Sequence, residues 1–263
     1  MTGCPGGLTT NGAPWEQARG AYSFVDELAS LRPKVRGVGQ QARFEKWVNT
    51  FEYLRVTGKV GCGCGEIDRV MAELAAIKDP AARKQYARAT VLPVRIRLNE
   101  DWGQMMTLAI QTADSWGGIG VVMGQELMNR GEINRLECHD PALRAALGGD
   151  LPASALPWME YRGTPRLFAV TKRSVIDRGE SLSLKIIALD KAPVRSVAIR
   201  VRPFGGEWQT IPATHLGRAV YEAKLPPPQD DFEYHITAET AGGQQLVWPA
   251  TAPSVNQTVV VTE

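Results

Sequence analysis

The spacing of apolar residues changes between Pro157 and Pro165, and this change constrains the fold more than any other feature. Before it, apolar side chains recur every three or four residues, as on one face of a helix. After it, they alternate with polar residues or form short blocks bounded by Gly, Pro and Asp, as in strands joined by turns. The pattern predicts a segregated α+β chain: an N-terminal helical bundle followed by a C-terminal all-β sandwich of the immunoglobulin or fibronectin III-like kind.

The sequence predicts four segments along the chain. Residues 1–14 are rich in Gly, Thr, Asn and Pro and are expected to form a flexible linker. Residues 15–150 form the expected helical domain, residues 151–165 a Pro-rich, semi-rigid joint, and residues 166–263 the β-sandwich domain. A chain of 263 residues is long enough for two domains that each bury a core.

Several helices are expected in the first half of the chain. Apolar periodicity predicts them over residues 15–31, 43–54, 66–77, 93–115 and 121–130. The glycine-rich stretch Gly58–Gly65 should separate the second from the third, because each glycine costs about 1 kcal/mol in a helix relative to Ala. Asp79 and Asp140, each followed by Pro, predict helix N-caps, and Gly148 predicts a C-cap.

Short strands are expected throughout the second half, because turn signals recur at close spacing. Alternation in Leu182, Leu184 and Ile186 indicates a strand with one buried face. The predicted strands cover residues 166–171, 181–189, 194–202, 207–212, 219–225, 232–239, 244–248 and 257–262.

Composition argues against two classes of partner. Thirty basic against 28 acidic residues give a net charge of +2, without the basic excess of a nucleic-acid binder, so no nucleic-acid partner is expected. No run approaches the roughly 20 apolar residues that span a bilayer, so no membrane partner is expected. The N-terminus lacks the charged and apolar regions of a secretory signal. No motif indicates a cofactor, and none is expected.

The four cysteines, Cys4, Cys62, Cys64 and Cys138, bear on metal binding. Cys62 and Cys64 are too close for the usual two-residue gap of a zinc knuckle, and Cys138 with His139 supplies a single candidate second half. We therefore expect free or buried thiols and no metal. A metal site built from these residues is the less favoured alternative.

One segment of the helical half has a pattern suited to a ligand. Residues 115–120 combine Trp116 with three glycines and are expected to form a loop between helices, in which the backbone can approach a ligand and the indole offers a flat apolar face. Gln125 and Glu126 follow, so Trp116 and Gln125 are candidate substrate-binding residues and Glu126 is a weak catalytic candidate. A plain helix–helix turn with a packed Trp is the alternative.

In the β half, Trp208, Tyr221 and Trp248 are candidate substrate-binding residues, because an aromatic ring can stack on the apolar face of a sugar. Each has a structural alternative as a core or strand-end residue. His215 and His235 stand alone in the sequence and are expected to face solvent or to form hydrogen bonds rather than to catalyse.

Two regions carry a resemblance to a known class of protein. The helix RFEKWVNTFEYL at 43–54 and the strands around residues 232–234 and 246–253 resemble the C-terminal helical plus fibronectin type III/immunoglobulin-like region of large multidomain bacterial glycoside hydrolases. The resemblance implies a non-catalytic accessory region that packs on a catalytic barrel domain and contacts a polysaccharide or oligosaccharide. It also implies a secreted or periplasmic location as part of a longer protein, with the cytoplasm as the alternative.

Two other functions remain open from the sequence. The chain could be a complete glycoside hydrolase with its site at the domain joint, or an interaction scaffold that pairs a partner strand at an exposed sheet edge. A glycosidase needs two carboxylates about 5 to 10 Å apart across a cleft. Glu100 and Asp101 are neighbours on a predicted helix and therefore point in different directions. Catalysis by this chain alone is not expected.

Overall fold

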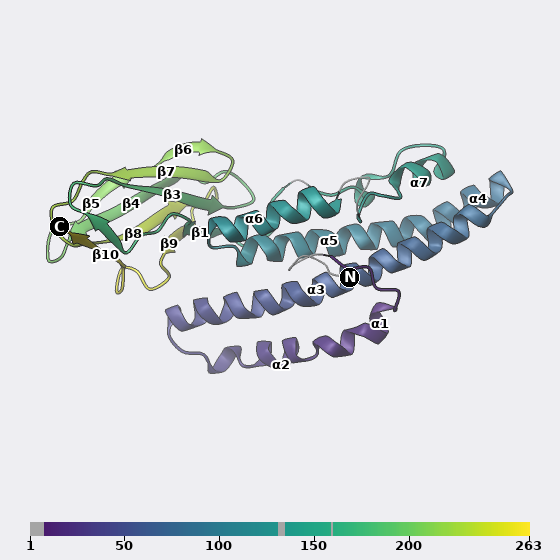
Figure 1. Cartoon of the computed structure of the whole chain (residues 1–263), viewed down its shortest axis with the longest axis horizontal. Coiled ribbons are helices and arrows are strands. Elements are labelled where there is room, and N and C mark those ends of the chain that lie inside the picture. The colour runs from purple at the N-terminus through teal and green to yellow at the C-terminus, as the bar shows by residue number, and fades with distance from the viewer. Residues whose placement is uncertain (1–7, 131–134, 159) are drawn as a thin grey trace. The chain divides into compact units, whose positions relative to one another are not determined.

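Figure 1 shows the computed structural model, which describes residues 8–130, 135–158 and 160–263. The N-terminal part of the chain is helical and the C-terminal part consists of two β-sheets, which confirms the predicted fold class. The described residues cluster into two compact units. Of these residues, the first unit contains 8–34, 46–112, 118–130 and 135–158, and the second contains 35–45, 113–117 and 160–263.

The helices vary widely in length, from single turns to α3, which has 39 residues. Among the described residues, none of them combines the length and apolarity that crossing a membrane requires. In chain order they are α1 (Trp15–Ala18), η1 (Arg19–Tyr22), α2 (Phe24–Ser30), η2 (Arg32–Lys34), α3 (Val38–Ala76), α4 (Pro80–Tyr86), η3 (Ala87–Val91), α5 (Leu92–Thr112), α6 (Trp116–Gln125), η4 (Glu126–Arg130), α7 (Asp140–Leu147) and η5 (Ala153–Ala155).

The predicted break at Gly58–Gly65 is wrong, because α3 runs through this stretch without interruption. Gly58, Gly61 and Gly65 lie on one face of α3, and we call them the glycine row. A Cβ on Gly65 would lie 2.1 Å from the carbonyl oxygen of Asn11, and one on Gly61 would lie 2.5 Å from that of Thr9. Because these glycines have no side chains, residues 8–12 can pack against the backbone of α3. We call residues 8–12 the N-terminal strap.

Two further contacts fix this arrangement. The backbone N–H of Asn11 donates to the carbonyl oxygen of Gly61 at 2.9 Å. A Cβ on Gly58 would lie 2.2 Å from the hydroxyl oxygen of Tyr22. Close packing on one face of α3 therefore outweighs the poor helix propensity of glycine.

The structure confirms two of the three helix caps that the sequence predicts. Asp79 is the N-cap of α4 and accepts a hydrogen bond from the Ala82 N–H at 2.7 Å, and Gly148 ends α7 with φ of +72°, so both predictions are confirmed. The predicted cap at Asp140 is wrong, because His139 occupies that position. The Asp140 carboxylate instead pairs with Arg95 at 2.7 and 3.0 Å, and both side chains are buried.

Two predicted segments of the helical half differ from the structure. Residues 15–31 form the short elements α1, η1 and α2 rather than one helix. The expected loop over residues 115–120 is wrong, because α6 begins at Trp116 and contains the glycines. The apolar residues that follow in α6 outweigh the glycines as a determinant of local structure.

The first unit has a core made by α3, α5 and α7. Ile67 and Leu74 of α3 face Leu98 and Trp102 of α5, and Leu143 of α7 joins them. All five side chains are buried. Packing of these helices therefore fixes the positions of the polar side chains on their outer faces.

Each of the eight predicted strands is present, with small shifts at the ends. The short strands β2 and β6 were not predicted. The strands are β1 (Arg166–Ala169), β2 (Val175–Asp177), β3 (Leu182–Leu189), β4 (Ser196–Pro203), β5 (Gln209–Pro212), β6 (Thr214–Gly217), β7 (Val220–Leu225), β8 (Phe232–Glu239), β9 (Gln245–Trp248) and β10 (Gln257–Thr262).

The strands form two sheets that share a core. One has the order β1-β3-β7-β6 and the other β2-β10-β8-β4-β5, with β9 paired to β8. The described pairs are antiparallel except for β10 with β2. Leu184 and Ile186 of β3 and Tyr234 and Ile236 of β8 are fully buried. The alternation predicted for β3 is therefore confirmed at these positions.

Candidate functional site

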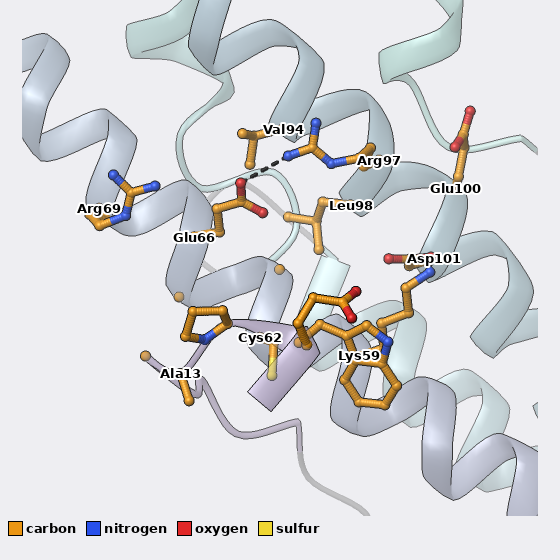
Figure 2. Close-up of a pocket in the computed structure, with 16 residues that line it drawn as sticks. Ala13, Lys59, Cys62, Glu66, Arg69, Val94, Arg97, Leu98, Glu100 and Asp101 are labelled. Carbon is orange, nitrogen blue, oxygen red and sulfur yellow. Dashed lines mark hydrogen bonds and ion pairs between the residues drawn. The ribbon is translucent and has the colours of Figure 1, made fainter. Parts of the chain in front are cut away.

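A pocket of about 710 Å³ lies in the first unit and is the candidate functional site. Its walls come from residues 12–16, from α3 and from α5 (Figure 2). Three basic and four acidic side chains line it, so its charges nearly balance. They are Lys59, Arg69, Arg97, Glu16, Glu66, Glu100 and Asp101.

Helical spacing places the charged groups of α3 and α5 opposite each other. Lys59 and Glu66 are seven residues apart on α3, and Arg97 and Asp101 are four apart on α5, so each pair shares a helix face. The Lys59 Nζ lies 2.7 Å from the Asp101 Oδ1. The Arg97 Nη2 lies 2.8 Å from the Glu66 Oε1, as the dashed line in Figure 2 shows. Two ion pairs of opposite polarity therefore cross the pocket.

The pair of Arg97 and Glu66 is open to solvent, with exposed side-chain fractions of 55% and 42%. An exposed pair of this kind adds at most about 1 kcal/mol to stability. Guanidinium and carboxylate groups have more donor and acceptor positions than one ion pair uses. The remaining positions are available to a ligand with several hydroxyl groups.

Apolar groups complete the pocket. Val94, Leu98 and the buried Cys62 line it together with the half-buried indole of Trp15. The Trp15 ring centroid lies 5.6 Å from that of Tyr22, so the indole is held from one side. Burial raises the pKa of the Cys62 thiol, which therefore stays protonated at neutral pH and is a poor nucleophile.

The structure gives Gln125 and Glu126 polar partners within the helical unit. Gln125 is buried, donates to the Tyr53 hydroxyl at 3.1 Å and accepts from the Asn129 amide at 2.8 Å. The Glu126 carboxylate pairs with Arg130 at 2.8 Å. Trp116 is half-exposed as the first residue of α6. The amide predicted to bind substrate thus holds α6 against α3, away from solvent.

The three aromatic candidates of the sandwich are all covered at least in part. Tyr221 is buried in the core, which corresponds to the structural alternative for that residue. Trp208 is half-buried, with the Arg202 guanidinium 4.4 Å above its ring and the His235 ring 4.8 Å away. Trp248 is half-buried against the core. His235 is itself buried, so of the two expectations for this residue, facing solvent or forming hydrogen bonds, the first is wrong.

The sequence reasoning missed Lys59 and Arg97 as members of a common site. Lys59 falls within the glycine-rich stretch that was expected to break the helix. With a continuous helix, the seven-residue spacing of Lys59 and Glu66 would have placed both on one face. This spacing is present in the sequence, but the low helix propensity of the glycines led to the prediction of a helix break between the two residues.

No protein-family model matches the chain, and no curated protein matches it either. Three solved structures show distant likenesses to it. An engineered protein aligns with 47% of this chain over 27% of its own length, at 15% identity and a TM-score of 0.30. An endo-β-1,4-mannanase from Thermotoga petrophila aligns with 64% of this chain over 44% of its own length, at 11% identity and a TM-score of 0.30.

The third likeness is to a chain from a structure of T cell activation by the bacterial superantigen toxic shock syndrome toxin-1. It aligns with 37% of this chain over 99% of its own length, at 10% identity and a TM-score of 0.29. TM-scores this low transfer neither fold nor function. The function therefore has to be argued from the residues of this chain.

Proposed function

We propose that this chain is a non-catalytic accessory region of a carbohydrate-active enzyme, and that α6 docks on the catalytic domain of the same polypeptide. The observation that carries the proposal is the composition and exposure of α6. The helix has no charged residue from Trp116 to Gln125. Val121 and Met123 are nevertheless 50% and 56% exposed.

A helix that is apolar around its whole circumference is normally buried. Contiguous apolar surface that stays exposed marks an interaction site. Met128, in the turn that follows α6, extends the exposed apolar surface. Covering such side chains contributes about 1.5–3 kcal/mol for each one fully buried. The surface of α6 is therefore suited to a permanent contact with another domain.

The class of enzyme rests on the resemblance of residues 43–54, 232–234 and 246–253 to the C-terminal regions of glycoside hydrolases. In this proposal the covering domain is the catalytic barrel, and the protein acts outside the cytoplasm on a polysaccharide. The carboxylates of Glu66 and Asp101 are engaged by basic side chains, which supports a binding role for the pocket rather than hydrolysis.

The test of catalysis is a reducing-sugar assay with the isolated chain on a panel of polysaccharides. The proposal expects no sugar release from any of them. Release that scales with the concentration of purified chain would overturn the non-catalytic assignment.

The test of docking uses the chain expressed together with the remaining sequence of its reading frame. The double variant Val121→Glu with Met123→Glu should free the catalytic domain from this region, measured as faster separation by limited proteolysis. Gln104→Glu, which adds a charge at an exposed position of α5, is the matched control and should leave proteolysis unchanged. Equal proteolysis of the double variant and the wild type would overturn the docking role.

A second candidate function, saccharide binding in the pocket of Figure 2, is favoured by the pocket itself. It combines an indole with guanidinium and carboxylate groups that can bind hydroxyls. Arg97→Ala should weaken retention in polysaccharide affinity gels about tenfold, because a hydrogen bond to a charged group contributes about 1.5–3 kcal/mol. Arg88→Ala, at an exposed position that does not line this pocket, is the matched control and should leave retention unchanged. Equal retention of Arg97→Ala and wild type would exclude the pocket as the binding site.

A further inference from the structure

A second group of side chains, away from those of the pocket, gathers three types of metal ligand. Asp68 comes from α3, and Cys138 and His139 come from the segment that leads into α7. One ligand atom from each residue lies within 4.8 Å of the others. The His139 Nε2 is 2.7 Å from the Asp68 Oδ1, although the residues are 71 positions apart in the chain.

A fourth candidate ligand, the thiol of Cys64, lies beside this group. Cys64 precedes Asp68 by one helical turn and therefore shares its face of α3. Cys64, Asp68 and Cys138 line the same hollow, which has a volume of about 480 Å³. Cys64 is buried and Cys138 is half-buried, and both are free thiols. Two sulfur atoms and one carboxylate thus line the hollow, and the imidazole of His139 lies beside the Asp68 carboxylate and the Cys138 sulfur.

We propose that Cys64, Asp68, Cys138 and His139 bind a Zn²⁺ ion. Thiolate, imidazole and carboxylate are the ligands that zinc takes in proteins, and four of them complete its tetrahedral shell. Ligand bonds of about 2.0–2.3 Å place neighbouring ligand atoms of a tetrahedron roughly 3.3–3.8 Å apart. The ligand atoms of Asp68, Cys138 and His139 lie within 4.8 Å of one another, and the Cys64 side chain would have to rotate toward them to complete the shell.

The surrounding charges suit this ligand set. Zn²⁺ bound by two thiolates, one carboxylate and a neutral imidazole leaves one surplus negative charge. The guanidinium of Arg135 lines the same hollow and is held there by a 2.8 Å hydrogen bond to the Thr10 hydroxyl. Its positive charge balances the surplus, and the site as a whole becomes neutral.

The site would join two parts of the helical unit. Cys64 and Asp68 belong to α3, whereas Cys138 and His139 precede α7. Binding energy at a site that forms in the folded state stabilises that state directly. The ion would therefore act as a structural cross-link that fixes the start of α7 against α3.

The first test measures zinc in the full chain. The protein is purified under reducing conditions, freed of metal with a chelator and titrated with Zn²⁺. We expect one Zn²⁺ per chain by atomic emission and a higher unfolding temperature in the loaded form. Co²⁺ in place of Zn²⁺ should give the near-ultraviolet absorption of a thiolate–cobalt bond. Failure to bind Zn²⁺ under these conditions would overturn the site.

Variants assign the ligands. Cys138→Ser and His139→Gln should each weaken Zn²⁺ binding more than about 100-fold, because loss of a residue behind the ligands already costs about 10–100-fold. Cys62→Ser is the matched control: this cysteine lies on the same helix but lines the pocket of Figure 2, so zinc binding should persist.

Circular dichroism of the metal-free variants shows whether they fold, and if one does not, the other carries the test. Wild-type zinc affinity in a folded Cys138→Ser or His139→Gln variant would overturn the assignment.

Discussion

At the scale of single residues, ion pairs between an arginine and a carboxylate occur in two different environments in the helical unit. Arg95 and Asp140 form an ion pair with both side chains buried, whereas Arg97 and Glu66 form one that is open to solvent. Removing one partner of a buried pair leaves an uncompensated charge in the core, but removing one partner of an exposed pair leaves a solvated charge. Burial, rather than pairing, therefore decides how much each pair matters.

This contrast gives a matched pair of variants. Asp140→Ala should lower the free energy of unfolding by about 3–5 kcal/mol, because Arg95 stays buried without a counter-charge. Glu66→Ala should lower it by at most about 1 kcal/mol. Urea denaturation of both variants measures the difference. Similar losses in the two would contradict the structural description of these pairs.

His235 provides a pH-dependent contribution to the stability of the sandwich. Burial lowers the pKa of His235 below its usual 6.5, and the nearby Arg200 and Arg202 lower it further, against the opposing effects of a hydrogen bond with Asn256 and of the charge of Glu233. The folded protein therefore binds the proton less readily than the unfolded chain does. The stabilising contribution is complete above pH 6.5 and is lost as the pH falls below that value.

The His235→Gln variant should lose this part of the pH dependence. Its unfolding temperature should fall less between pH 7 and pH 5 than that of the wild type, as scanning calorimetry at matched ionic strength would show. His215→Gln, at an exposed site, is the control and should behave as the wild type does. Parallel pH profiles for His235→Gln and the wild type would contradict the expectation.

At the scale of elements, the chain shows where local sequence signals suffice and where they do not. Asp79 and Gly148 act as the expected caps because a cap depends on its immediate neighbours. The strands were predictable because alternation reports a buried face directly. The continuity of α3 through Gly58–Gly65 was not, because it depends on the N-terminal strap and on Tyr22, which are distant in sequence.

The candidate sites also depend on contacts between residues that are distant in sequence. The pocket needs α3 and α5 side by side, and the zinc ligands need α3 beside the start of α7. Cys138 and His139 are adjacent in the sequence and were recognised there as a candidate half of a metal site. Asp68 could be added only by the fold, since residues 71 positions apart share no local pattern.

Replacing glycine by alanine should have opposite effects on stability at Gly65, in the glycine row, and at Gly120, in α6. Gly65→Ala should lower the free energy of unfolding by about 1–3 kcal/mol, because the new Cβ would meet the Asn11 carbonyl oxygen at 2.1 Å. Gly120→Ala in α6, where nothing lies within 4 Å, should raise it by up to about 1 kcal/mol. Chemical denaturation distinguishes the two. A stabilising Gly65→Ala would show that the strap does not lie on α3.

At the scale of the whole molecule, the described residues form two hydrophobic cores that share no member. One contains Ile67 and Trp102 among helices, and the other contains Leu184 and Tyr234 between sheets. All the strands in the part of the chain that the structure describes lie within residues 166–262. A unit with its own core can fold independently.

We therefore expect a fragment of residues 160–263 to fold alone. It should give a β-type circular dichroism spectrum and unfold cooperatively with heat, and the effect of His235→Gln should persist in it. Heat capacity and far-ultraviolet measurements on the fragment check this. An unfolded fragment would show that the sandwich depends on residues earlier in the chain.

The N-terminal strap has a consequence for the order of events during synthesis. Translation proceeds from the N-terminus, so residues 8–12 leave the ribosome before the helix face that receives them has been made. Their place against the backbone of α3 exists only once Gly65 has emerged and the helix has formed around it. The first described residues to be made thus settle only after residues made later, and a nascent chain that pauses before Gly65 leaves them uncovered.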